Sequence, residues 1–140
     1  MRTFSCDIET DGLDPSVVWC IAVQDVDSGQ VITFSGTTLG LFKPWMASEA
    51  DCLVFHNGIG YDVPVLTRLC GIDFSDVQVE DTLVMSQLDK PRRDGGHSLA
   101  SWGERLGFDK GDHEDWSKFS EEMLTYCIRD TEITTKLYRH

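Results

Sequence analysis

Two carboxylates stand where the first strand-like segment of the chain ends. Asp7 and Glu9 belong to the segment FSCDIETDGLD, residues 4–14. Successive side chains of a strand point to opposite faces, so the two acids would share one face while Cys6 and Ile8 point into a core. Two adjacent carboxylates repel each other, and a divalent metal ion with oxygen ligands would neutralise them. The pattern alone also fits an acidic strand end that runs into a solvated turn.

Three side chains from later in the sequence could complete such a site. Asp62 follows the glycine-rich segment HNGIGYD, and Pro64 is tolerated only in a first helical turn, which places Asp62 at a helix N-terminus. Tyr126 and Asp130 are four residues apart and share one face of the last helix. Taken singly, these residues also fit a helix cap, a core aromatic and a surface charge. Four acids that converge from different elements would destabilise the fold unless a cation neutralised them.

Composition narrows the function classes. The 140 residues are 41% hydrophobic and 26% charged, which is ordinary for one soluble globular domain spanning 1–140. The net charge of −12 argues against a broad basic surface for nucleic acid, but not against binding through metal ions. The five scattered cysteines lack C-x-x-C spacing and indicate buried thiols in a reducing, cytoplasmic compartment. No apolar run has membrane-spanning length, and no signal-peptide pattern opens the chain.

The element order predicts an α/β domain. Three strands, at about 4–10, 17–25 and 30–35, should form an antiparallel meander, because turn chemistry separates the last two. An apolar strand at 52–55 and a short one at 77–79 should extend the sheet. Helices are expected at 38–49, from 63 to Gly71, and over 82–88, 98–106 and 121–140. The result is a mixed sheet with helices on its faces.

Several other residues have structural interpretations. Asp81 is expected to cap a helix, and His56 and His97 lack a second zinc ligand at the usual spacing. The loop over 89–96 carries three basic side chains that could contact a nucleic-acid backbone, although a solvated loop fits as well; they are Lys90, Arg92 and Arg93. The four tryptophans are expected in the core: Trp19, Trp45, Trp102 and Trp116.

Three segments together resemble a known family. DIETDGLD, HNGIGYDVPVL and YCIRD, in this order and spacing, resemble the three motifs of the DEDD superfamily of 3′–5′ exonucleases. The likeness is greatest to the proofreading exonuclease domain of phage family-A DNA polymerases, and it extends to DTLVMSQL, HSLASWGERLG and EEMLTY. The superfamily divides by a histidine five residues, or a tyrosine four residues, before the last acid. Thr125 and Tyr126 occupy those positions here, so the chain resembles the tyrosine branch.

The resemblance implies a ribonuclease H-like fold and a site with two divalent ions, Mg²⁺ or Mn²⁺, about 4 Å apart. It assigns Asp7 to bridge both ions, Glu9 and Asp130 to complete one site and Asp62 the other. Tyr126 would orient the attacking water, since a phenol with a pKa near 10 is a poor general base. Contacts to the 3′-terminal nucleotide fall on four residues: Thr10, Leu13, Asn57 and Tyr61.

The implied activity is release of nucleoside monophosphates from single-stranded or frayed DNA 3′ ends, in replication proofreading or DNA processing. An exoribonuclease of the same branch would use the same acids, and an inactive binding module is a further alternative. No membrane or organic cofactor is expected. A free-standing enzyme, a partner of a separate polymerase subunit and an excised domain all remain open, as does a phage-encoded protein acting in the host cytoplasm.

Overall fold

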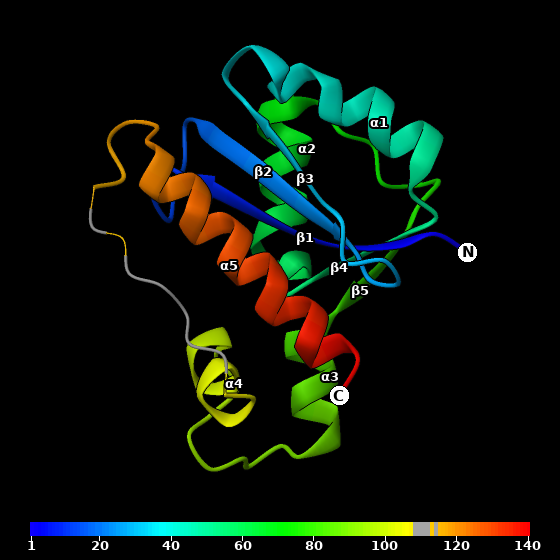
Figure 1. Cartoon of the computed structure of the whole chain (residues 1–140), viewed down its shortest axis with the longest axis vertical. Helices are drawn as coiled ribbons and strands as arrows, with labels where there is room; N and C mark the ends of the chain where they lie inside the picture. Colours follow the sequence, from blue (N-terminus) through cyan, green and yellow to red (C-terminus); the bar gives the residue numbers. More distant parts are fainter. Residues whose placement is uncertain (108–112, 114) are drawn as a thin grey trace.

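The computed structural model describes residues 1–107, 113 and 115–140. Its strands form one mixed sheet in the order β3-β2-β1-β4-β5 (Figure 1). Antiparallel pairing joins β1 (Thr3–Thr10) to β2 (Val18–Asp25) and β2 to β3 (Val31–Ser35). Parallel pairing adds β4 (Cys52–Phe55) beside β1, and β5 (Gln78–Asp81) beside β4. This topology confirms the predicted meander and the ribonuclease H-like mixed sheet.

Helices cover both faces of this sheet. The long helix α5 crosses one face diagonally, while α1 and α2 lie on the other (Figure 1). The α-helices are α1 (Phe42–Glu49), α2 (Val63–Cys70), α3 (Thr82–Asp89), α4 (Leu99–Arg105) and α5 (Glu121–Tyr138). Two short helical segments complete the set, the 3₁₀ helix η1 (Gly36–Leu41) and the π-helical turn η2 (Gly58–Asp62). Within the described residues, none of the helices has the length and apolarity needed to cross a membrane.

The single helix expected over 38–49 is divided into two elements. The 3₁₀ segment η1 ends at Leu41, and α1 begins at Phe42. Pro44 is therefore the third residue of α1, within its first turn, where the missing N–H of proline breaks no helical hydrogen bond. The division removes the conflict between Pro44 and the predicted helix interior.

Strand β1 separates two apolar clusters by the alternation of its side chains. Phe4, Cys6 and Ile8 are buried in the larger cluster, with residues of α1 and α2. On the other face, Ser5 Oγ donates to the main-chain oxygen of Thr131 in α5 at 3.2 Å. The side chains of Asp7 and Glu9 have the same parity as Ser5. The alternation therefore directs both acids towards α5, as the sequence predicts.

Helix α5 is fixed to the sheet along most of its length. Ser120 caps it by accepting a hydrogen bond from the backbone N–H of Met123 at 3.1 Å. Met123 and Cys127 are fully buried against Cys20 and Ala22 of β2. Asp130 continues this buried face one turn further on and is 5% exposed. The packing that stabilises α5 thus also holds an acid against the sheet.

Candidate active site

The four predicted acids line one cavity of about 390 Å³. Asp7 and Glu9 come from β1, Asp62 from the junction of η2 with α2, and Asp130 from α5. The cavity lies at the carboxyl edge of the parallel strands, where α/β proteins commonly bind ligands. Three elements that are distant in the sequence therefore contribute carboxylates to one space.

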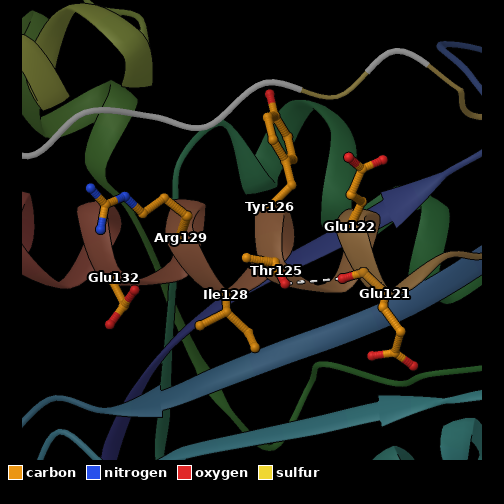
Figure 2. A pocket seen from close by; sticks show the side chains of 7 residues that line it. All are labelled: Glu121, Glu122, Thr125, Tyr126, Ile128, Arg129 and Glu132. Atoms are coloured by element: carbon orange, nitrogen blue, oxygen red, sulfur yellow. Dashed lines mark hydrogen bonds between the residues drawn. The ribbon is translucent and has the colours of Figure 1, made fainter.

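Tyr126 lines the same cavity from α5. It also borders a second, open hollow of about 620 Å³ along that helix, and Figure 2 shows it projecting on the same side of α5 as Glu122. Its ring meets that of Trp116 edge to face, with centroids 5.6 Å apart at 81°. Tyr126 is thus a half-buried wall of the acid cavity, and the core interpretation of this residue does not hold.

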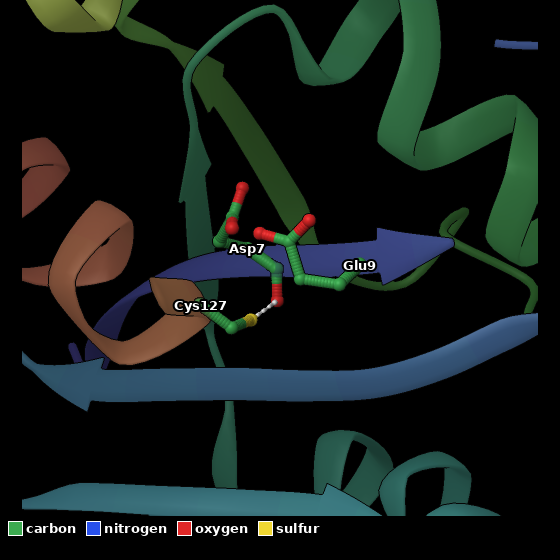
Figure 3. A group of neighbouring side chains, drawn as sticks. All are labelled: Asp7, Glu9 and Cys127. Carbon is green, nitrogen blue, oxygen red and sulfur yellow. Dashed lines mark hydrogen bonds between the residues drawn. The ribbon is translucent and has the colours of Figure 1, made fainter. Parts of the chain in front are cut away.

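Asp7, Glu9 and Cys127 lie close together where β1 meets α5 (Figure 3). One ligand atom from each, two carboxylate oxygens and the Cys127 sulfur, lie within 4.8 Å of one another. The Cys127 thiol donates to the main-chain oxygen of Asp7 at 3.4 Å and so packs α5 against β1. A register shift follows between Glu9 and Thr10, and such bulges often redirect side chains beside active sites.

The electrostatics of the cavity favour a bound cation. Burial, followed by the negative charge of Asp7, raises the pKa of Glu9 from 4.5 to about 11. The same two causes raise the pKa of Asp62 well above its usual range. Among the described residues that line the cavity there is no lysine or arginine. Carboxylate oxygens are the ligands that Mg²⁺ and Mn²⁺ prefer, so the donor set fits the divalent ions that the sequence predicts.

Asp62 does not serve as a helix cap. It occupies the N-cap position of α2, yet its side chain makes no capping hydrogen bond. Asp81 instead accepts from three backbone N–H groups, those of Asn57 at 2.9 Å, Ile59 at 3.1 Å and Leu83 at 2.9 Å. It therefore caps α3, as predicted, and also fixes the loop that carries Asn57. Asn57 borders the acid cavity with a left-handed backbone, φ 65°.

The turn after β1 holds an exposed leucine in a fixed position. Leu13 is 95% exposed, although the turn around it is tied at several points. The Asp11 carboxylate accepts from the backbone N–H groups of Ser16 at 2.9 Å and Val17 at 3.1 Å. Arg68 donates to the main-chain oxygen of Pro15 at 2.7 Å. Leu13 is thus exposed on a turn whose backbone is held by hydrogen bonds.

Beside this turn lies a third hollow, of about 340 Å³. Thr10, Leu13 and Tyr61 line it, and so does Trp116. It adjoins the acid cavity, because Glu9, Tyr61 and Trp116 border both. The predicted substrate contacts therefore gather in one region next to the acids.

These residues belong to a recognised type of domain. Residues 1–140 match the family described as 3′–5′ exonuclease. The chain belongs to that family. Its similarity to the DNA-directed DNA polymerase of Escherichia phage T7 is distant, at 28% identity over 177 residues. That match covers 94% of the chain and 25% of the polymerase, so the chain spans a quarter of its relative. The polymerase of Enterobacteria phage T3 gives the same values.

Solved structures confirm the exonuclease fold. The family B DNA polymerase of Pyrobaculum calidifontis superposes with a TM-score of 0.74 at 16% identity, covering 99% of this chain and 24% of that one. Brucella melitensis NrnC bound to pGG superposes with a TM-score of 0.72 at 20% identity, covering 98% and 70%. Members of the 3′–5′ exonuclease family are typically metal-dependent hydrolases of nucleic acid, and Asp7 and Glu9 form a possible acidic metal site in this member.

The four tryptophans of the exonuclease domain are buried or pack against its apolar clusters, as predicted, but one of them also borders the site. Trp19 and Trp45 pack against apolar clusters, and Trp102 is 3% exposed, as predicted. Trp116 is half-buried against the same cluster as Trp19, and its exposed part borders two of the hollows. It lies outside any helix or strand, so no periodicity in the sequence indicates which way it points. The sequence feature that could have indicated its position beside the site is a large aromatic residue in a mainly polar segment.

The basic loop of the exonuclease domain is folded back on the protein. Arg93 pairs with Asp89 at 2.7 Å and places its guanidinium 4.4 Å from the ring centre of Trp102. Lys90 and Arg92 remain exposed. Of the three basic residues, Arg93 thus has partners within the protein. Lys90 and Arg92 are the two that stay accessible to a nucleic-acid backbone.

The two histidines near the motifs have separate hydrogen-bond partners. His56 borders the acid cavity and its Nδ1 lies 2.8 Å from Thr82 Oγ1. His97 Nδ1 lies 2.6 Å from Ser86 Oγ. Neither joins the group of potential metal ligands found among the described residues.

Proposed function

We propose that this chain is a metal-dependent 3′–5′ exonuclease that releases nucleoside monophosphates from single-stranded or frayed DNA ends. The observation that carries the proposal is the meeting of Asp7, Glu9, Asp62 and Asp130 in one cavity that adjoins the hollow beside Leu13. An acid cluster alone could be accidental. Its position next to a restrained, exposed apolar turn, in a member of the 3′–5′ exonuclease family, supports phosphodiester hydrolysis at a strand end.

The four acids would serve as the oxygen ligands of two divalent ions. Asp7 is suited to both ions, Glu9 and Asp130 to one of them, and Asp62 to the other. When bound, the ions would neutralise the phosphate and stabilise the leaving 3′ oxygen. The acids themselves fix the position of that charge, because β1, α2 and α5 are rigid elements joined through the core. This arrangement also explains how an acidic chain could bind a polyanion at one point.

Tyr126 would hold the attacking water by a hydrogen bond from its place on the cavity wall. Attack at phosphorus breaks the bond to the 3′ oxygen of the preceding nucleotide and frees a 5′-monophosphate. A phenol titrates near pH 10, so Tyr126 would orient the water rather than deprotonate it. Its edge-to-face contact with Trp116 restricts the ring.

The 3′-terminal nucleotide would occupy the hollow beside the acids. Leu13 would contact the base, while Thr10, Asn57 and Tyr61 would contact the sugar and phosphate region. Leu13 has the exposure that such a contact requires, and Asp81 fixes the backbone of Asn57. Only a few nucleotides need to enter, so the net charge of −12 does not prevent binding.

We further propose that residues 1–140 act as one exonuclease domain in replication proofreading or DNA processing. The phage polymerases that the chain resembles support this role, and a polymerase in trans is a candidate partner. RNA is the main alternative substrate, because an exoribonuclease of the same branch would use the same four acids.

The test is digestion of matched DNA and RNA oligonucleotides by the purified chain. Both carry a 5′ label and a free 3′ hydroxyl, and are incubated with Mg²⁺, with Mn²⁺ or with EDTA. We expect metal-dependent shortening of DNA from the 3′ end, faster than shortening of RNA. Faster digestion of RNA would assign the chain to end-trimming of RNA, and digestion of neither would contradict an active exonuclease.

A further inference from the structure

Trp116 forms one wall of the hollow of about 340 Å³ beside Leu13, and it comes from a distant part of the chain. Among the described residues, the others lining this hollow belong to β1, the turn after it, or η2. They include Leu13 and Tyr61. Trp116 approaches from the segment before α5 and is half-buried. Three parts of the chain therefore form the hollow: β1 with the turn after it, η2, and the segment before α5.

The Trp116 ring is held although its segment has no regular structure. Trp19 Nε1 donates to the main-chain oxygen of Trp116 at 2.9 Å. The ring meets His113 edge to face at 4.6 Å and 80°, and meets Tyr126 at 5.6 Å and 81°. An aromatic side chain with a fixed main chain and two ring contacts loses little conformational freedom when a ligand binds to it.

Trp116 also borders the acid cavity, together with Glu9 and Tyr61. A nucleotide with its phosphate at the carboxylates would extend its base into the adjoining hollow, between the Leu13 turn and Trp116. Bases stack on aromatic rings with little dependence on sequence, because every base has a π face. Trp116 has the size, position and restraint that stacking requires.

We propose that Trp116 is a stacking platform for the base of the 3′-terminal nucleotide. This inference rests on the proposed exonuclease function and adds a specific contact to it. It predicts that the enzyme recognises the presence of a terminal base more strongly than its identity.

The test compares two DNA oligonucleotides that differ only in the last nucleotide. One ends in thymidine and the other in an abasic tetrahydrofuran residue, each with a 3′ hydroxyl. Cleavage of that residue is measured under single-turnover conditions, with enzyme in excess over the DNA but below saturation. Trp116→Leu should slow removal of thymidine on the order of 5- to 150-fold, the loss of one stacked base. It should change removal of the abasic residue by less than about twofold, and Trp116→Phe should restore most of the rate.

The control is Trp45→Leu, which removes a tryptophan from the opposite face of the sheet, where it packs 4.8 Å from Phe4. It should affect both oligonucleotides by the same factor. Equal slowing of both by Trp116→Leu, or no slowing of either, would overturn the stacking role.

Binding separates this inference from the exonuclease proposal. The same two oligonucleotides, labelled with fluorescein at the 5′ end, are titrated in Mn²⁺ with Asp130→Asn alone and with Asp130→Asn combined with Trp116→Leu. Selective loss of affinity for the thymidine end supports stacking even if the wild-type chain cleaves nothing. Cleavage by the wild type without this selectivity would support the exonuclease and refute the platform.

Discussion

The hydroxyl of Tyr61 lies 2.6 Å from Thr10 Oγ1, which links the loop before α2 to the end of β1. Both hydroxyl oxygens also lie within hydrogen-bond distance of the main-chain oxygen of Gly12, Tyr61 at 2.7 Å and Thr10 at 2.9 Å, so one hydroxyl donates to Gly12 and the other to its neighbouring hydroxyl. This small network joins the segment that supplies Asp62 to the turn that presents Leu13. The position of the substrate contact is therefore tied to the position of the metal ligands.

Removing the Tyr61 hydroxyl should loosen that turn. Tyr61→Phe keeps the ring and deletes its hydrogen bonds, each worth about 0.5–1.5 kcal/mol. We expect KM for a single-stranded oligonucleotide to rise roughly 2- to 10-fold, with a smaller change in kcat. Steady-state kinetics test this, with Tyr138→Phe, on α5 and outside the hollow residues, as the matched control. A Tyr61→Phe enzyme with unaltered KM would show that the network has no part in substrate binding.

The acids and the tyrosine should differ in the size of their effects. Asp7→Ala or Asp130→Ala should abolish cleavage, because each removes a proposed metal ligand. Tyr126→Phe should lower the single-turnover rate by about 10- to 1000-fold, the scale of losing one positioning hydrogen bond, while metal binding is retained. A Tyr126→Phe enzyme that keeps the full rate would refute the water-orienting role.

Metal should stabilise the fold through the same acids. An ion that binds only the native state adds RT ln(1 + [M]/Kd) per independent site, about 2.7 kcal/mol at a hundredfold excess over Kd. Tm should therefore rise in millimolar Mn²⁺. Asp7→Asn or Asp130→Asn should not lower Tm in EDTA, since each relieves repulsion, and should reduce the rise with Mn²⁺. Destabilised variants together with a metal-insensitive wild type would instead indicate structural acids.

The raised pKa of Glu9 predicts a dependence of stability on pH in the absence of metal. The folded state holds the Glu9 proton up to about pH 11, whereas the unfolded chain releases it near its ordinary value of 4.5. The contribution of the Glu9 proton to the free energy of unfolding is then fully present below pH 4.5 and is lost as the pH rises towards 11. The raised pKa of Asp62 acts in the same direction.

The free energy of unfolding is measured in EDTA from about pH 5 to about pH 9, which lies between the unfolded and folded pKa values of Glu9. Wild type should lose stability across this range more steeply than Glu9→Gln, which cannot titrate. Parallel slopes for the two proteins would mean that Glu9 is ionised in the metal-free native state.

Rules of local structure predicted where the acids lie on their strand and helices. Strand alternation fixed the shared face of Asp7 and Glu9, and the position of Pro64 in the first helical turn located Asp62 at the start of α2. The four-residue spacing placed Tyr126 and Asp130 on one side of α5. Each of these inferences depends on geometry within a single element, which the chain encodes over a few residues.

The orientations of several other side chains depend on tertiary contacts and could not be predicted from the sequence. The direction of Trp116 depends on Trp19 and Tyr126, which lie on other elements. The fold-back of Arg93 depends on Trp102, nine residues further along. The hydroxyl network of Tyr61 likewise joins segments about fifty residues apart, beyond the reach of any periodicity.

The central claim is hydrolysis from the 3′ end by the acid cluster, and one gel tests it directly. A 5′-labelled single-stranded DNA is incubated with Mn²⁺ and either wild type or Asp7→Asn, alongside the same strand ending in a 3′ phosphate. We predict a ladder shortening by single nucleotides with wild type, resistance of the phosphate-ended strand, and no ladder with Asp7→Asn. Immediate release of the label as a mononucleotide, nicking of a circular strand, or an equal ladder from Asp7→Asn would contradict the account.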